Sequence, residues 1–255
     1  MMDSPKLPPH YELIQLGNVD SVISEATRRA GDGADEGTLV WAVEQSDALT
    51  PKGHRWFSPP GNLYCALILR PDFSNERSGQ LAYVAALAAG SALAGLLSPM
   101  TGLRYRWPSG LYINELKAGQ VTLASSGGGS DPYEWLVVGA MINVAVHPPN
   151  PEPDEFNSVH ASGATEVTVT QLLEDYAKYF LNWINRWAED GFVPIGRQWQ
   201  IRADGIGEDI QLEIGDRRLE GTFVELDEQG RLVLSTPEKV DAHLSVNEFF
   251  ELDRK

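Results

Sequence analysis

The longest uncharged stretch of the chain contains the run from Leu81 to Leu97, and alanine and glycine dominate this run. A membrane-spanning helix needs roughly 20 strongly apolar residues, and this run supplies too few of them. Small, uncharged side chains suit a helix that other elements approach closely. The run therefore predicts a buried helix in the core of a globular fold.

The charge balance limits the partners. The chain has 20 basic and 36 acidic residues, a formal net charge of −16. Nucleic acids and anionic membranes are bound through basic surfaces, so neither is expected as a partner. A small anionic ligand in a local pocket stays compatible with this charge.

Cysteine and histidine usage argues against disulfides and metals. Cys65 is the single cysteine, and the five histidines, at positions 10, 54, 147, 160 and 243, lack the spacing of metal ligands. No metal site is therefore expected. Residues 1–10 contain no apolar signal core, and we predict a cytoplasmic protein.

Apolar patterns divide the chain into two parts. Residues 37–44, 62–69 and 135–146 read as strands, with shorter strands at 104–107, 111–113 and 120–124. Helical spacing predicts a helix over 172–187 with Thr170 as its cap. After Gly191 short strands alternate with turns, which predicts a small all-β domain near the lower size limit for independent folding.

The segment from Glu44 to Tyr64 carries the most specific signal. It contains Trp56 and, after Phe57, the run Ser-Pro-Pro-Gly-Asn-Leu-Tyr. This ending resembles the substrate loop of biotin protein ligases, in which a GRGRxGR run precedes the tryptophan. Residues 48–54 instead read Ala-Leu-Thr-Pro-Lys-Gly-His. The residues that follow the loop match the family pattern, but none of the arginines of GRGRxGR is present at residues 48–54.

Further motifs resemble the same family in the same order. Residues 20–26, Asp-Ser-Val-Ile-Ser-Glu-Ala, resemble DSTN-x-EA, and residues 106–110, Arg-Trp-Pro-Ser-Gly, resemble KWPND. Lys117, ten residues after Trp107, falls on the lysine of a K-[VL]-A-G run. Residues 138–144 resemble a G-x-G-x-N-V strand, and residues 221–232 resemble the G-x(5)-D-x-x-G-x-L hairpin of an SH3-like domain. Their shared order indicates the biotin/lipoate protein ligase superfamily.

The resemblance implies an α+β fold. We expect a mixed β-sheet with flanking helices over residues 1–198, followed by an SH3-like β-barrel over residues 199–255.

The resemblance also implies a reaction and a site. The family joins biotin to ATP as biotinyl-adenylate and then passes the acyl group to a lysine of a carrier protein. ATP is therefore the implied cofactor, and a biotinyl or lipoyl carrier domain the implied partner. Lys117 and Arg106 are the candidate catalytic residues. The candidate ligand-binding residues are Ser21, Gln45, Lys52, Arg55, Trp56, Gly139 and Asn143. For each of these a purely structural role, as helix cap, strand end or loop support, stays open.

The departures from the motifs are chemical. Leu49, Pro51 and His54 replace arginines that would stabilise charge at a phosphate. Gly110 replaces the aspartate of KWPND, and Val22 and Ile23 replace the polar Thr and Asn of DSTN. A biotin urea without these partners would lose about 1–3 kcal/mol for each unpaired group. Two functions stay open: an acyl–protein ligase or acyltransferase with altered specificity, and a non-catalytic relative that keeps only a binding pocket.

Cys65 raises a separate possibility, because some octanoyl transferases of the superfamily use a thiol nucleophile. It lies within the apolar run Leu63–Leu67, so we expect a small buried core residue instead.

Overall fold

A computed structural model describes residues 4–51, 53–149, 155–215, 217–238 and 240–254. Its main body is a seven-stranded mixed sheet in the order β1-β2-β3-β7-β6-β5-β4. The strands are β1 (Glu12–Val19), β2 (Thr38–Gln45), β3 (Leu63–Leu69), β4 (Leu103–Arg106), β5 (Gly110–Ile113), β6 (Leu116–Ser125) and β7 (Leu136–Ile142). Only β1 and β2 pair in parallel; the other neighbours are antiparallel.

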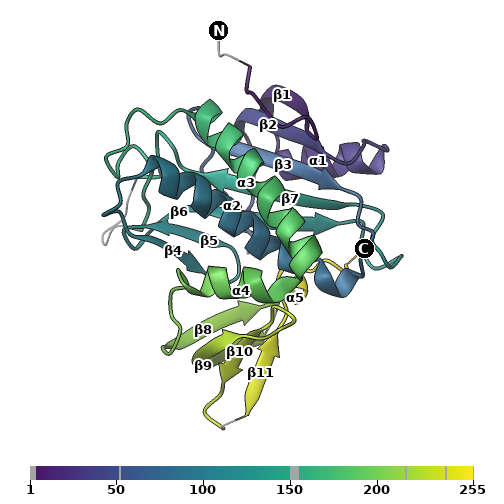
Figure 1. The fold of residues 1–255 in the computed structure, drawn as a ribbon, viewed down its shortest axis with the longest axis vertical. Coiled ribbons are helices and arrows are strands. Elements are labelled where there is room, and N and C mark those ends of the chain that lie inside the picture. The colour runs from purple at the N-terminus through teal and green to yellow at the C-terminus, as the bar shows by residue number, and fades with distance from the viewer. Residues whose placement is uncertain (1–3, 52, 150–154, 216, 239, 255) are drawn as a thin grey trace.

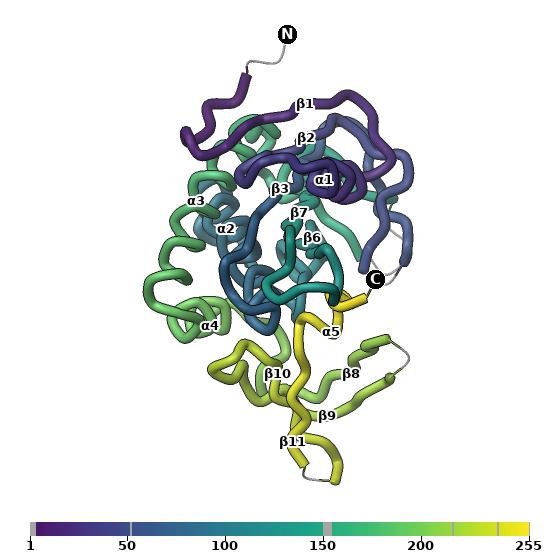
Figure 2. Tube along the Cα trace, turned by 90° about the vertical axis from the view of Figure 1, so that its right-hand side faces the viewer, coloured from purple at the N-terminus to yellow at the C-terminus, as the bar shows by residue number. Residues whose placement is uncertain are grey.

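Helices cover both faces of this sheet (Figures 1 and 2). On one face lie α2 (Gln80–Leu96) and α3 (Val169–Asp190), and on the other lies α1 (Val22–Gly31). Strand β2 shows why both faces are apolar: Leu39 and Trp41 enter the core beneath α2 and α3, whereas Val40 and Ala42 enter the core beneath α1. Successive side chains of a strand point to opposite faces, so a sheet covered on both sides needs an almost continuous apolar strand.

The alanine-rich helix is a core element, as predicted. Residues 75–96 are long and apolar enough to cross a membrane by length and composition, but most of them are buried within the fold. Its small side chains permit a close approach at Gly90, where an added Cβ would lie 1.9 Å from the hydroxyl of Tyr105.

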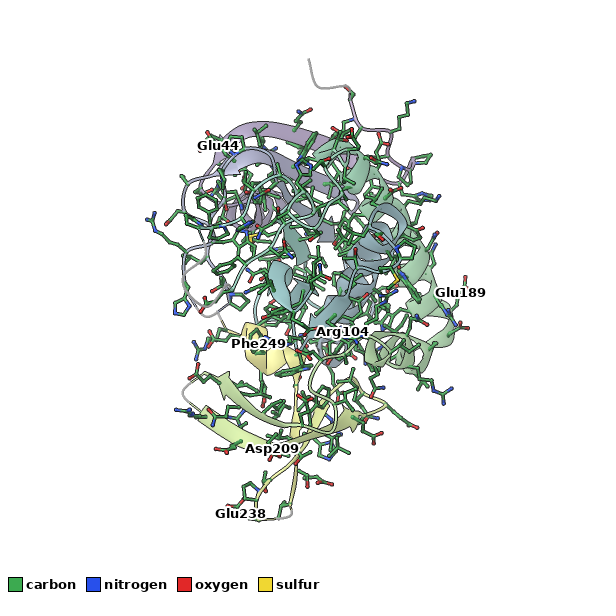
Figure 3. The ribbon with its side chains drawn as sticks, turned by 90° about the vertical axis from the view of Figure 1, so that its left-hand side faces the viewer. Glu44, Arg104, Glu189, Asp209, Glu238 and Phe249 are labelled. Atoms are coloured by element: carbon green, nitrogen blue, oxygen red, sulfur yellow. The ribbon has the colours of Figure 1, made fainter. Side chains whose placement is uncertain are left out.

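A second, four-stranded antiparallel sheet follows, in the order β11-β10-β9-β8. Its strands are β8 (Asp209–Ile214), β9 (Arg217–Leu226), β10 (Leu232–Ser235) and β11 (Asp241–Leu244). Helix α4 (Phe192–Gln200) leads into this domain, α5 (Val246–Phe250) follows it, and Figure 3 shows Phe249 of α5 between the two parts. The mixed sheet with flanking helices and the small β-domain are confirmed.

Some details differ from the sequence-based expectation. The third helix begins at Val169, because Thr168 rather than Thr170 accepts the capping hydrogen bond, from the backbone N–H of Gln171. Strand β1 was not predicted. Helix α4 continues through position 198, where the sequence pattern places the domain boundary.

Hydrogen bonds fix the small domain against the sheet domain. The hydroxyl of Tyr83 donates to the carbonyl of Gly230 at 2.8 Å, and the Gln80 amide donates to the carbonyl of Gln229 at 2.9 Å. Strand β4 also pairs with the linker, since Tyr105 exchanges backbone hydrogen bonds with Arg202 and Asp204. These contacts set the width of the space between the two parts.

Candidate ligand-binding cleft

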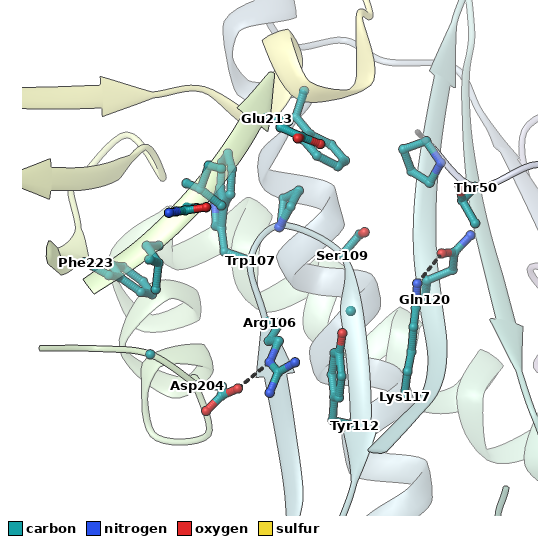
Figure 4. A pocket seen from close by; sticks show the side chains of 18 of the residues that line it. Thr50, Arg106, Trp107, Ser109, Tyr112, Lys117, Gln120, Asp204, Glu213 and Phe223 are labelled. Atoms are coloured by element: carbon teal, nitrogen blue, oxygen red, sulfur yellow. Dashed lines mark hydrogen bonds and ion pairs between the residues drawn. The ribbon is translucent and has the colours of Figure 1, made fainter. Parts of the chain in front are cut away.

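A cleft of about 600 Å³ lies between the sheet domain and the small domain. Figure 4 shows its two walls. One wall comes from the tip of the loop at 50–54, the turn at 106–110 and the first half of β6. The other comes from residues 204–213, Phe223 and Phe249. The volume suits a small-molecule ligand, for which pockets of roughly 300–1,000 Å³ are usual.

Both candidate catalytic residues line this cleft. Lys117 lies on β6, half-buried, and its Nζ donates to Oε1 of Gln120 at 3.2 Å. The same Nζ lies 5.1 Å from the centre of the Trp56 ring, within the range of a cation–π interaction. The structure thus brings together two residues, 117 and 56, that the sequence analysis selected from separate motifs.

Arg106 is held in place by its neighbours. Its Nε forms a short hydrogen-bonded ion pair with Asp204 of the linker, and its guanidinium lies 4.2 Å from the centre of the Tyr112 ring. Because Asp204 already neutralises Arg106, this residue adds little unbalanced positive charge to the cleft.

In the turn at residues 106–110, which corresponds to KWPND, the Tyr112 ring lies next to the last residue, Gly110. A Cβ built on Gly110 would lie 2.7 Å from Cε2 of Tyr112, so the tyrosine ring occupies the space that an aspartate side chain would need. A side chain at position 110 would therefore require the Tyr112 ring to move.

The loop aligned with GRGRxGR forms a small hairpin tip. Leu49 and Arg55 pair across it, and the backbone N–H of Thr50 donates to the carbonyl of His54 at 2.8 Å. Thr50, Pro51 and His54 line the cleft. Arg55 is not among the lining residues, and it pairs with Asp47 at 3.1 Å on an exposed surface. Lys52 lies outside the described residues.

The remaining candidate ligand-binding residues do not line the cleft and are engaged elsewhere. Ser21 caps α1 by accepting a hydrogen bond from the N–H of Ile23. Gln45 accepts from the N–H of Val22 at 2.8 Å and donates to Ser58 at 3.0 Å. Asn143 donates to the carbonyl of Asn157 at 3.0 Å. These hydrogen bonds engage Ser21 and Gln45, whereas Oδ1 of Asn143 is buried without a partner among the described residues. Whether any of the three contacts a ligand stays a prediction.

Large side chains fill the sheet surface beneath α1. A Cβ on Gly139 would lie 2.2 Å from Cδ1 of Ile23, so Ile23 packs directly on that glycine. Met141 is buried in the same cluster as Trp56 and Tyr64, and its sulfur lies 3.7 Å from Nε2 of Gln45. On β6, Gln120 is the cross-strand partner of Met141.

Sequence reasoning missed Gln120, Met141 and the wall formed by the small domain. Met141 had a signal in the motifs, because position 141 is the second glycine of G-x-G-x-N-V. Gln120 follows Ala118-Gly119 directly and had no such signal. The opposite wall has no motif, because only the docking of the small domain brings residues 204–213 to Lys117.

Cys65 is a buried thiol, and the described residues show no metal site. Burial raises the pKa of the Cys65 thiol to about 12, and the side chain is inaccessible on β3, which confirms the expected core role. Among the described residues, no group of three His, Cys, Asp or Glu side chains is placed to hold a metal ion.

Comparison with known proteins gives consistent matches along the chain. The family model "Biotin/lipoate A/B protein ligase family" matches residues 55–201, and "Biotin protein ligase C terminal domain" matches residues 205–250. A biotin–[acetyl-CoA-carboxylase] ligase of Paracoccus denitrificans is 32% identical over 226 residues, covering 87% of this chain and 93% of that protein.

Two solved structures share the architecture. A biotin protein ligase-like protein of unknown function from Silicibacter sp. TM1040 has a TM-score of 0.81 and 25% identity, covering 96% of this chain and 99% of its own. The biotin protein ligase of Aquifex aeolicus in complex with biotin and ATP has a TM-score of 0.77 and 25% identity, covering 93% and 97%.

Proposed function

Because the chain belongs to the biotin/lipoate A/B protein ligase family, we propose that it binds a carboxylate-bearing acyl ligand, or the adenylate of such an acid, with an altered specificity that excludes biotin. The ligand's anionic group lies at Lys117, in the cleft that Arg106 also lines. Transfer of the bound acyl group to a lysine of a carrier domain is the activity that such a ligand would serve.

The observation that carries this proposal is the filled surface beneath α1. Met141 stands in place of a motif glycine and faces Gln120 across the strand pair, and Ile23 lies on the retained motif glycine, Gly139. Interiors are close-packed, and an added ring system cannot enter without displacing these side chains. Val22 and Ile23 also offer no hydrogen bond to a urea group. Both effects oppose biotin, whereas the cleft at Lys117 stays open.

The lining suits a single negative charge better than a triphosphate. Among its described residues, Arg106 and Lys117 face three carboxylates, those of Asp204, Glu208 and Glu213. Nucleoside triphosphates need several cations or a metal around their phosphates. The described lining therefore does not fit ATP well, and we derive no step through this cofactor.

A second function has its own observation. Arg55 and Arg106, two of the cations that remain near the altered motifs, are paired with Asp47 and Asp204. Such pairing favours a non-catalytic relative that binds a small molecule or a protein without activating the ligand. Cytoplasmic location is part of both proposals.

The test combines ligand binding with exchange chemistry. Thermal unfolding is measured with biotin, lipoate, octanoate, ATP and the corresponding acyl-adenylates, since a ligand of the native state must raise stability. Pyrophosphate exchange is then measured with each acid that stabilises the protein. We expect an acid other than biotin to stabilise it. Exchange with that acid supports a ligase, and binding without exchange supports the non-catalytic relative. Robust biotin-dependent exchange would refute the proposed specificity.

A further inference from the structure

Gln120 is a buried polar residue with an unused donor at the cleft. Its side chain is 1% exposed, yet it contributes to the cleft lining. Nε2 has no hydrogen-bond partner within the described part of the chain, and of the buried unpaired side-chain atoms found there it alone belongs to a lining residue. A buried donor without an acceptor is costly and needs an explanation. A ligand oxygen in the cleft would supply one.

The orientation of this amide is fixed by Lys117. Oε1 of Gln120 accepts from the lysine ammonium at 3.2 Å. Turning the amide over would place its NH₂ group against the ammonium, two donors facing each other. Nε2 must therefore point away from Lys117, and Figure 4 shows the amide between Lys117 and Thr50. The amide oxygen of Gln120 thus faces the ammonium of Lys117, and its NH₂ group lies beyond, on the side of Thr50.

The inner side of this pair is closed. Met141 stands opposite Gln120 across the β6–β7 ladder and is buried in the cluster beneath α1. A ligand whose oxygen reaches Gln120 cannot extend further in that direction. Its remaining atoms must run outward, towards the small domain.

The outward path is apolar at its centre and acidic at its edge. Trp107, Leu212 and Phe249 line it, with the rings of Trp107 and Phe249 5.9 Å apart. Glu208 and Glu213 lie on the same wall as Leu212. An apolar chain gains by burial against the rings, whereas a second negative charge would meet these carboxylates.

We propose that Gln120 is a specificity-determining residue and that the ligand is a monoanionic carboxylic acid with an apolar tail. One carboxylate oxygen accepts from the Gln120 amide and the other faces Lys117. The tail lies against Trp107, Leu212 and Phe249. This inference rests on the proposed function, in that it names the class and the orientation of the acyl ligand.

Calorimetry with a graded ligand series tests the inference. The probes are butanoate, hexanoate, octanoate and decanoate, the primary alcohols of equal length, and octanoyl-adenylate as the esterified form of the same acyl group. We expect affinity to rise about three- to fourfold with each methylene. Each alcohol should bind at least tenfold more weakly than its acid. The free acid should bind more tightly than the adenylate.

Two variants isolate the amide. Gln120→Leu keeps the volume and removes the donor, and Gln120→Glu keeps an acceptor for Lys117 while placing a negative charge in the cleft. Either variant should weaken binding of the carboxylic acid at least tenfold. If circular dichroism shows that Gln120→Leu does not fold, Gln120→Glu provides the test. Gln15→Leu, on the edge strand β1 and outside the cleft lining, is the control and should change affinity less than threefold.

The outcomes separate this inference from the proposed function. Acid binding that is lost in Lys117→Ala but unchanged in both Gln120 variants would overturn the inference and leave the proposed function standing. Equal binding of acids and alcohols, or tighter binding of the adenylate, would also overturn the inference alone. If neither carboxylates nor acyl-adenylates bind at millimolar concentration, both proposals fail.

Discussion

Gln120 on β6 lies directly opposite Met141 on β7, and Met141 stands at the position of the second glycine in G-x-G-x-N-V. Neighbouring positions on paired strands are close enough for their side chains to pack together. Glycines at both positions would leave a hollow on the sheet, and this pair fills it. The loss of biotin binding that we propose would then follow from packing as well as from missing hydrogen bonds.

The facing pair makes a gain-of-function prediction. The double variant Gln120→Gly/Met141→Ala should lose stability by about 2–5 kcal/mol, because a large buried side chain is truncated. Biotin should raise its melting temperature more than that of the wild type, since the hollow is reopened. Val137→Ala, on the same face of β7, should be destabilised without any response to biotin. No biotin response in a folded double variant would show that other residues exclude it.

Lys117 should matter for anion binding more than for folding. Replacing it with alanine removes the ammonium beside the ligand's negative charge, and we expect a carboxylate ligand to bind about 2 kcal/mol more weakly. The free energy of unfolding should change by less than about 1 kcal/mol, because a half-exposed lysine contributes little. Calorimetry and denaturant titration measure the two quantities. Unchanged affinity in a folded variant would place the anion site elsewhere.

Cys65 should be inert in the native protein. The thiolate is the reactive form, and burial raises the pKa of this thiol to about 12. At pH 8 a chromogenic thiol reagent should react with Cys65 only after the protein has been unfolded in guanidinium. Rapid stoichiometric reaction of the folded protein would contradict the core role and would revive the thiol-nucleophile alternative.

Asp20, which precedes the N-cap residue of α1, should make the free energy of unfolding depend on pH in the acid range. The Arg28 side chain hydrogen-bonds its carboxylate and lowers its pKa from 3.8 to about 2. Because the folded pKa lies below the unfolded one, the ionised group stabilises the fold above about pH 4, and this contribution is lost as the pH falls towards 2. Asp20→Asn should therefore melt below the wild type at pH 6, with the gap closing near pH 2. A gap independent of pH would contradict this assignment.

Much of the fold could be predicted because local patterns match its burial. The apolar alternation around Leu39, Val40 and Trp41 indicated a strand, and the small residues of 81–97 indicated a buried helix. Strand β1 was not predicted because it is an edge strand with mostly exposed or half-buried side chains. Its sequence pattern therefore resembles that of a polar loop. Thr168 was missed as a cap because Thr170 offers the same side chain two residues later.

The site was less predictable because it depends on contacts between distant segments. Motif spacing led to Lys117, Arg106 and Trp56, but the ion pair of Arg106 with Asp204 exists only because the linker docks along β4. Ser21 and Gln45 fit the family pattern by sequence, yet they hydrogen-bond backbone and core partners outside the cleft. Whether they contact a ligand stays a prediction.

Calorimetric titration of the purified protein with biotin tests the central claim most directly. With Val22 and Leu49 in place of polar partners, and with Gln120 and Met141 filling the sheet surface, we predict a dissociation constant weaker than about 100 μM. The titration is carried out with and without ATP and magnesium, so that a requirement for the nucleotide is detected. A dissociation constant in the submicromolar range under either condition would contradict the altered specificity proposed for this chain.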